Sequence, residues 1–258
     1  MRQELLGLKI GGSVITDKAV PYKAKRDVIR SIAKSLKAVE MPLLIAHGSG
    51  SFGHTSAQKY GGKNGYTHKW GIAKVARDAQ EINRILMDIF IEEGLPVISF
   101  SPRSLLLTEE GRPVQFLFAP IEEALKQGLI PVMYGDVIWD TKQKTTIFSG
   151  ETLLNLICQH LQRQDYQISD IIQLCNVPGV LDERKQIIPE INQKNWSTVK
   201  DNVISLQVAD VTGGMSHKIE DALVMTGYGI KTMITHSNSV VFLQEFFEGK
   251  YVKGTLIR

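Results

Sequence analysis

Glycine-rich turns with a cation close by are the features of this sequence best suited to chemistry. The first turn is Gly11-Gly12-Ser13, with Lys9 before it and Lys18 after it. Glycines expose backbone N–H groups and let an anion come close, because no side chain stands in the way. A lysine adds a compact positive charge that needs no bidentate geometry. The pattern favours a phosphate site, although a surface lysine beside an ordinary turn would give the same residues.

The second turn, Gly48-Ser49-Gly50-Ser51-Phe52-Gly53, follows an apolar segment at 43–46 and ends at His54. It matches G-x-G-x-x-G, but a dinucleotide site also needs an acidic residue about 20 residues further on. Residues 66–77 contain no Asp or Glu, which counts against NAD. We expect a helix to start at His54, whose imidazole can donate to a phosphate near the helix N-terminus. A core or capping histidine is the competing interpretation.

Two further turns lie later in the chain. Thr212-Gly213-Gly214 offers an N-cap and exposed amides, and Lys218 follows about one turn into the predicted helix. Ser149-Gly150-Glu151 joins a predicted strand to a predicted helix and carries a carboxylate. Glu151 has two possible roles: it can form ion pairs with Lys9 and Lys218, or it can stabilise its own helix N-terminus. The sequence does not decide between them.

Composition sets limits on the class of protein. The chain has 258 residues, 43% hydrophobic and 22% charged, which is ordinary for a globular protein. With 30 Lys+Arg against 27 Asp+Glu, the charge is too even for nucleic acid to be the main partner. Cys158 and Cys175 form no Cys-x-x-Cys pair and no zinc spacing, so we expect reduced thiols. Neither a signal peptide nor a membrane-spanning run is found, so we expect a cytoplasmic protein.

Short apolar segments alternate with amphipathic ones, which predicts an α/β fold around a largely parallel sheet. Helices are predicted at 25–39, 72–93, 121–126, 151–162, 215–226 and 240–247. Strands are predicted at 5–10, 43–46, 96–101, 129–134, 137–139, 145–148, 170–174, 231–235 and 254–257, with 113–118 as an edge or hairpin strand. A polar break around 163–167 divides the chain into lobes at 1–165 and 166–258, which we expect to share one continuous sheet.

These motifs, in this order, resemble the amino acid kinase superfamily, and within it the isopentenyl phosphate kinases. The resemblance extends from Lys9 to 254–257 and rests on Lys-x-Gly-Gly-Ser, His-Gly-x-Gly-Ser-Phe-Gly-His, Tyr-Gly-Asp, Ser-Gly-acid, Val-x-Gly-Val and Asp-Val-Thr-Gly-Gly-Met-x-x-Lys. His54 is the most discriminating residue, because relatives that act on carboxylates or UMP are not expected to carry it. The resemblance implies a three-layer αβα sandwich.

The resemblance also implies ATP-dependent phosphorylation of isopentenyl phosphate, with ATP bound by the C-terminal lobe and the acceptor by the N-terminal lobe. The residues implied to bind ATP are Lys9, Gly11, Gly12, Ser13, Asn176, Gly213 and Lys218. Those implied to bind the acceptor are Gly48, Ser49, Gly53, His54 and Gly150. Lys9, Lys18, His54 and Lys218 would be the catalytic residues. Mg²⁺ with ATP and a homodimer are implied as well, without a metal ligand from the chain.

The chain departs from the family pattern at three positions. Ser49 replaces a glycine and could narrow the turn or add a donor, Glu151 replaces an aspartate, and Asn176 replaces an aspartate near the nucleotide. An apolar pocket for a five-carbon tail is expected from the helix at 72–90. The alternatives are a kinase for a phosphonate or another alkyl monophosphate, as in fosfomycin kinases, an NAD-dependent oxidoreductase, and a nucleotide sensor without turnover.

Overall fold

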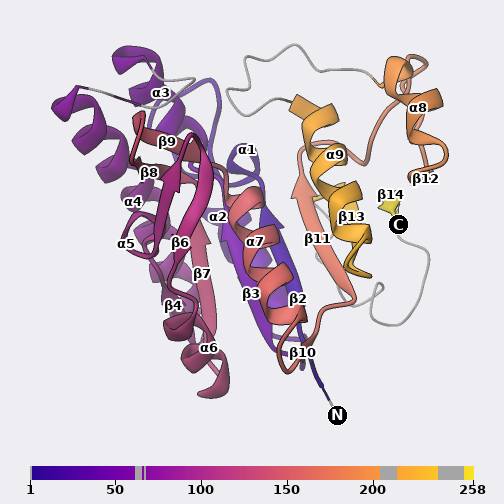
Figure 1. Cartoon of the computed structure of the whole chain (residues 1–258), viewed down its shortest axis with the longest axis horizontal. Helices are drawn as coiled ribbons and strands as arrows, with labels where there is room; N and C mark the ends of the chain where they lie inside the picture. Colours follow the sequence, from indigo (N-terminus) through magenta and orange to yellow (C-terminus); the bar gives the residue numbers. More distant parts are fainter. Residues whose placement is uncertain (1, 62–65, 67, 204–213, 238–252) are drawn as a thin grey trace.

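The computed structural model describes residues 2–61, 66, 68–203, 214–237 and 253–258. Its centre is an eight-stranded sheet in the order β12-β14-β13-β11-β2-β3-β7-β4 (Figure 1). All neighbouring strands are parallel except β13 and β14, so the prediction of a largely parallel sheet is confirmed. The strands are β2 (Leu6–Ile10), β3 (Leu43–His47), β4 (Val97–Ser99), β7 (Ile130–Tyr134), β11 (Asp170–Cys175), β12 (Glu190–Ile191), β13 (Lys231–His236) and β14 (Gly254–Ile257).

Helices cover both faces of this sheet. Helices α2 (Arg26–Leu36) and α4 (Lys69–Glu92) pack on one face, where Ile29 and Ile82 meet the side chains of β2 and β3. Helices α6 (Ala119–Lys126) and α7 (Gly150–Gln162) pack on the other, and Figure 1 shows α7 in front of β2 and β3. Helix α9 (Gly214–Thr226) covers β13 and β14. The expected three-layer αβα sandwich is therefore confirmed.

A second, four-stranded sheet lies beside the first, in the order β6-β5-β8-β9. Strand β6 (Arg112–Phe116) pairs with β5 (Leu106–Glu109) at the edge, which confirms the edge strand expected at 113–118. Strands β8 (Asp136–Asp140) and β9 (Lys144–Phe148) form an antiparallel pair. Strand β5 was not predicted, and neither was the two-stranded pairing of β1 (Gln3–Glu4) with β10 (Tyr166–Gln167).

Several boundaries differ from the predictions for physical reasons. The strand expected at 96–101 spans only Val97–Ser99, because Pro96 has no backbone N–H to donate and Pro102 begins the short helix α5 (Pro102–Leu105). The helix at 240–247 and the cap at Thr212 lie outside the described residues. The other short helices are α1 (Gly12–Ile15), α8 (Trp196–Val199) and the 3₁₀ turn Lys200–Asn202. Within the described segments, no helix has the length and apolarity that crossing a membrane requires.

The two predicted lobes meet in the main sheet, where β11 pairs with β2 in parallel. The division of acceptor and nucleotide between residues before and after 165 stays a prediction. The register matters for the site: Ile10 pairs with both Leu174 and His47, and His47 pairs with Tyr134. Because these four strands are parallel, the turns that follow them all emerge at one edge of the sheet.

Candidate active site

The turns at the carboxyl ends of β2, β3 and β7 each begin with a glycine. The amides of Gly11, Gly48 and Gly135 donate to the carbonyls of Leu174, Ile10 and His47, at 2.9, 3.0 and 2.9 Å. Each glycine thus continues the hydrogen bonding of the sheet for one more residue before its turn leaves the sheet. The turns therefore start side by side, although they are far apart in the sequence.

Beyond this point the backbones approach too closely for side chains. A Cβ atom on Gly12 would lie 2.4 Å from the amide nitrogen of Gly50. A Cβ atom on Gly150 would lie 2.4 Å from the carbonyl oxygen of His47. No other residue fits at either position unless the backbone moves, so glycine is dictated by packing of one turn against another.

One cavity lies over these turns and gathers residues from both halves of the chain. Asn176 is not on its wall: the side-chain amide of Asn176 donates to the carbonyl of Ser13 at 2.8 Å, and Lys25 Nζ donates to the same carbonyl at 3.2 Å. Gly213 lies outside the described residues. The other predicted site residues all line the cavity, namely Lys9, Gly11, Gly12, Ser13, Lys18, Gly48, Ser49, Gly53, His54, Gly150 and Lys218.

A buried carboxylate links the two lysines that come from different halves of the chain. Glu151, at the start of α7, is only 3% exposed. Its Oε2 lies 3.7 Å from Lys9 Nζ and 3.6 Å from Lys218 Nζ, and its Oε1 accepts a hydrogen bond from Gln173 at 2.9 Å. Both interpretations left open by the sequence fit the structure, because Glu151 faces the two lysines and also lies in the first turn of α7. Gln173 had no sequence motif to single it out.

The helix that carries His54 begins earlier than expected. Helix α3 spans Gly50–Tyr60, so the prediction that a helix starts at His54 is wrong. The amides of its first turn belong to Gly50 and the residues just after it, and Ser51 N donates to Thr16 Oγ1 at 2.9 Å. His54 lies about one turn further along and lines the cavity. Ser49 also contacts this helix: its Oγ lies where a Cβ atom on Gly53 would be, so Gly53 has to be a glycine for the two to fit.

The end of the cavity away from the lysines is apolar. Val75 and Ala79 of α4 line it, as the predicted pocket from the helix at 72–90 requires. Tyr66 packs in the same apolar cluster with Val75 and Val137, and its backbone is fixed by two hydrogen bonds of 2.6 Å with Thr145 Oγ1. Neither Tyr66 nor Val137 was predicted from the sequence to line the site. The Tyr-Gly-Asp motif directly precedes Val137 and was the sequence feature that could have pointed to it.

Asp136 of that motif also lines the cavity and is buried. Its carboxylate accepts hydrogen bonds from Arg103 Nη1 and, at 2.8 Å, from the amide of Val137. Burial raises the pKa of Asp136 to about 6, and the hydrogen bond from Arg103 opposes that rise. Arg103 Nη2 also donates to the carbonyl of Ala76 at 3.4 Å, so this side chain joins α5, β8 and α4 behind the apolar wall.

His47 lies behind the second turn and is fully buried. Burial lowers the pKa of His47, so the imidazole is neutral near pH 7. Its Nδ1 donates to the carbonyl of Gly48 at 3.1 Å, and its Nε2 lies 3.1 Å from the Asn83 side chain on α4. The histidine thus ties the glycine turn to the helix that forms the apolar wall, without adding charge there.

Comparisons with known proteins agree with this geometry. The model of the amino acid kinase family matches residues 8–236. Isopentenyl phosphate kinase of Methanocaldococcus jannaschii is 31% identical over 83% of this chain and 84% of its own. The enzyme of the same name from Methanothermobacter thermautotrophicus is 29% identical over 97% of each chain. A T. acidophilum isopentenyl phosphate kinase solved as a product complex superposes with a TM-score of 0.78, at 25% identity, over 98% of this chain and 100% of that one.

Removal of the buried carboxylate should destabilise the protein. Lys9 is only 7% exposed, and in Glu151→Ala it loses the negative charge that faces it. Lys218 loses its contact with the same carboxylate. We expect the free energy of unfolding in urea to fall by about 3–5 kcal/mol. Glu123→Ala is the matched control, because it removes a carboxylate from an exposed pair with Lys126 and should change little. Equal losses in the two variants would contradict the role given to Glu151.

Removal of Arg103 should destabilise the protein in a pH-dependent way. The raised pKa of Asp136 means that its protonated form stabilises the fold, so this contribution is complete below about pH 4 and is lost as the pH rises through about 6. Arg103→Leu leaves the charged carboxylate unpaired, and we expect a loss of about 3–5 kcal/mol at pH 8 and a smaller loss at pH 5. Urea unfolding at both pH values tests this, with Arg84→Leu on the surface of α4 as control. A loss independent of pH would argue against it.

Proposed function

Because the chain belongs to the amino acid kinase family, we propose that it transfers the γ-phosphoryl group of ATP to isopentenyl phosphate. The products are isopentenyl diphosphate and ADP. The observation that carries the proposal is one cavity that has lysines and glycine turns at one end and an apolar wall at the other. The named relatives and the solved product complex support the same acceptor. Membership of a kinase family also argues against the NAD-dependent alternative.

The cation-rich end fits the phosphates of ATP. We assign Lys9, Lys218, the turn Gly11-Gly12-Ser13 and Gly213 to these phosphates, since ammonium groups and exposed amides are the donors that an anion needs. The Gly11 amide is already bonded to the Leu174 carbonyl, so Gly11 contributes by leaving room for the anion. Asn176 acts there through its hydrogen bond to the Ser13 carbonyl, which fixes the turn. Mg²⁺ is proposed to enter with ATP, where it would offset part of the negative charge of the phosphates.

The acceptor lies between the second turn and the apolar wall in this proposal. His54 and the amide of Gly150 donate hydrogen bonds to its phosphate, while Gly48, Ser49 and Gly53 line the junction between the two phosphate groups. The Gly48 amide itself stays bonded to the Ile10 carbonyl. The five-carbon tail then extends toward Val75, Ala79 and Val137, where burial of apolar surface favours it by about 25 cal/mol per Å². A small phosphonate would need several polar contacts in that space, whereas Val75, Ala79 and Val137 give the wall a mainly apolar surface.

The reaction demands alignment and charge compensation more than covalent catalysis. An oxygen of the acceptor phosphate attacks the γ-phosphorus of ATP, and the bond from that phosphorus to the oxygen bridging it to the β-phosphorus breaks. A phosphate monoester is already ionised near neutral pH, with a second pKa of about 6, so no strong general base is needed. The main barrier is repulsion between two anions. Lys9, Lys18, Lys218 and His54 converge on one cavity and can offset it.

A substrate panel tests the proposed acceptor. We expect ADP release with isopentenyl phosphate to exceed release with longer prenyl phosphates, simple alkyl phosphates and phosphonates such as fosfomycin. His54→Ala should lower turnover by about 10²–10³-fold while ATP still binds, because one donor to the developing charge is lost. His68→Ala, at an exposed position outside the cavity, is the control and should keep full activity. Turnover of a phosphonate alone would redirect the assignment, and ATP binding without any turnover would leave a nucleotide sensor.

A cytoplasmic homodimer completes the proposal. Strand β4 is an edge strand of the main sheet with Ile98 exposed, and an edge of this kind is suited to pairing with a second copy. Light scattering coupled to size exclusion should give twice the chain mass of 28.8 kDa. Ile98→Lys should shift the particle toward the single-chain mass, since a charge at the edge opposes pairing. A single-chain mass for the unmodified protein would exclude the dimer.

A further inference from the structure

The segment between α1 and α2, residues 16–25, is a hairpin that brings Lys18 to the cavity. Thr16 and Ala24 form an antiparallel bridge at its base. Asp17 N donates to the Lys23 carbonyl at 2.9 Å, and Lys25 N donates to the Ile15 carbonyl at 2.8 Å. Lys18 is exposed near the tip and lines the cavity. A long, exposed lysine can act at a fixed point only if the backbone that carries it is held in place.

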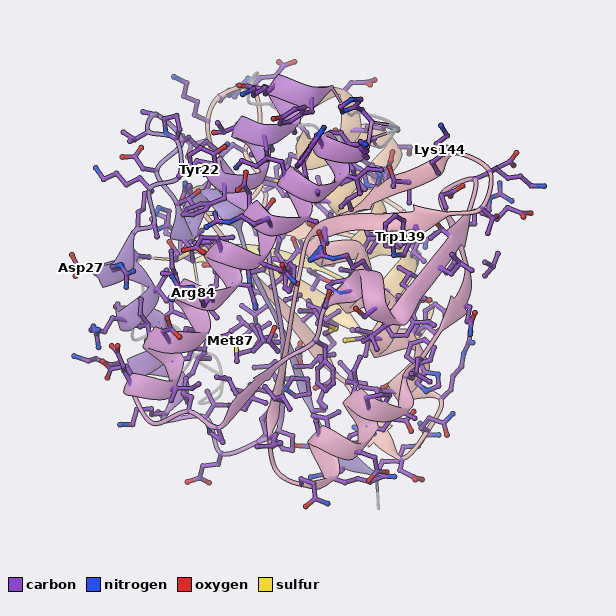
Figure 2. All side chains as sticks on the ribbon, turned by 90° about the vertical axis from the view of Figure 1, so that its left-hand side faces the viewer. Tyr22, Asp27, Arg84, Met87, Trp139 and Lys144 are labelled. Carbon is purple, nitrogen blue, oxygen red and sulfur yellow. The ribbon has the colours of Figure 1, made fainter. Side chains whose placement is uncertain are left out.

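Tyr22 packs the tip of this hairpin against helix α3. Its ring meets the buried ring of Phe52 on α3 edge-on, with centroids 5.7 Å apart and an interplanar angle of 86°. Figure 2 shows Tyr22 on the same face of the molecule as Arg84 and Met87 of α4. The φ angle of Tyr22 is +57°, a left-handed conformation that a residue with a bulky side chain adopts only where its surroundings enforce it.

Lys74 of α4 holds Tyr22 from the other side. Its Nζ lies 4.7 Å from the centroid of the Tyr22 ring and donates to the hydroxyl at 3.3 Å. The same ammonium contacts both carboxylate oxygens of Asp78, each at 2.5 Å, and Arg77 Nη1 lies 3.4 Å from that carboxylate. Asp78 is fully buried, so its position is fixed by the helix. The chain of contacts therefore runs from a buried acid through Lys74 to the hairpin.

We propose that Tyr22, Lys74 and Asp78 form a clasp that positions Lys18 for phosphoryl transfer. These are positioning residues: none of the three lines the cavity as Lys18 does. The clasp fastens the hairpin to α3, which carries His54, and to α4, which carries Val75 and Ala79. Its effect on catalysis rests on the proposed kinase activity, whereas its effect on the hairpin does not.

The first experiment follows the hairpin itself and needs no acceptor. We expect hydrogen exchange at the amides of 16–25 to rise about tenfold or more in Tyr22→Ala. Tyr22→Phe keeps the ring against Phe52 and under the Lys74 ammonium, so exchange should stay close to that of the unmodified protein. Lys74→Met should also raise exchange at 16–25, because it removes the contact that holds Tyr22 from α4. Its matched control is Lys59→Met, which should leave exchange at 16–25 unchanged, because Lys59 also lies over a tyrosine ring, that of Tyr60, but not at the hairpin. Unchanged exchange in Tyr22→Ala would overturn the clasp.

The second experiment is a double-mutant cycle with Lys18, using the acceptor that shows turnover in the substrate panel. Tyr22→Ala should lower kcat about tenfold or more, with KM for ATP within about threefold, and Tyr22→Phe should restore most of the rate. In a Lys18→Ala background, Tyr22→Ala should cause no further loss, because it acts through that lysine. An equal loss in both backgrounds would overturn the positioning role. Absence of turnover in the unmodified protein would instead count against the proposed function, and the exchange experiment would still decide on the clasp.

Discussion

The arrangement of the site depends on the close approach of backbone turns at the carboxyl edge of a parallel sheet. Gly12 against Gly50, and Gly150 against His47, leave no room for a Cβ atom. These contacts join residues that are 38 and 103 positions apart in the sequence, and the first of them depends on β2 and β3 being parallel neighbours in register. The glycines therefore serve two requirements at once. They allow the turns to pack, and they leave N–H groups facing the space where an anion would bind.

Such packing would fail if it also forced like charges together without compensation. Lys9 and Lys218 come from opposite halves of the chain, and one carboxylate oxygen of Glu151 lies within 3.7 Å of both ammonium groups. Both contacts are longer than a hydrogen bond, so the attraction is one of charge. Because the carboxylate already faces both lysines, little reorganisation would be needed for a phosphate to bind there as proposed. The family pattern has an aspartate at this position. The Glu151 side chain is one methylene longer, and its carboxylate lies close to the ammonium groups of both lysines.

The sequence was informative where local chemistry determines structure and much less so where distant residues meet. Apolar spacing located α2 to within three residues at either end, and the glycine motifs identified most of the cavity wall. Helix α3 was placed four residues late, because Gly50, Ser51 and Gly53 are poor helix formers and its stability comes from packing of Phe52. Arg103 with Asp136, or Tyr22 with Lys74, cannot be paired from one sequence, since nothing local in either partner marks the other.

Helix α4 connects the apolar end of the cavity to the hairpin. Val75 and Ala79 are four residues apart and form one stripe on the cavity wall, while Lys74 and Asp78 form the neighbouring stripe, about 100° round the helix. A change in the position of this helix would therefore alter the width of the apolar end and the support of Lys18 together. An acceptor bound as proposed would contact the same helix whose other stripe holds Tyr22. In that proposed arrangement, recognition of the tail and placement of Lys18 would both depend on one turn of α4.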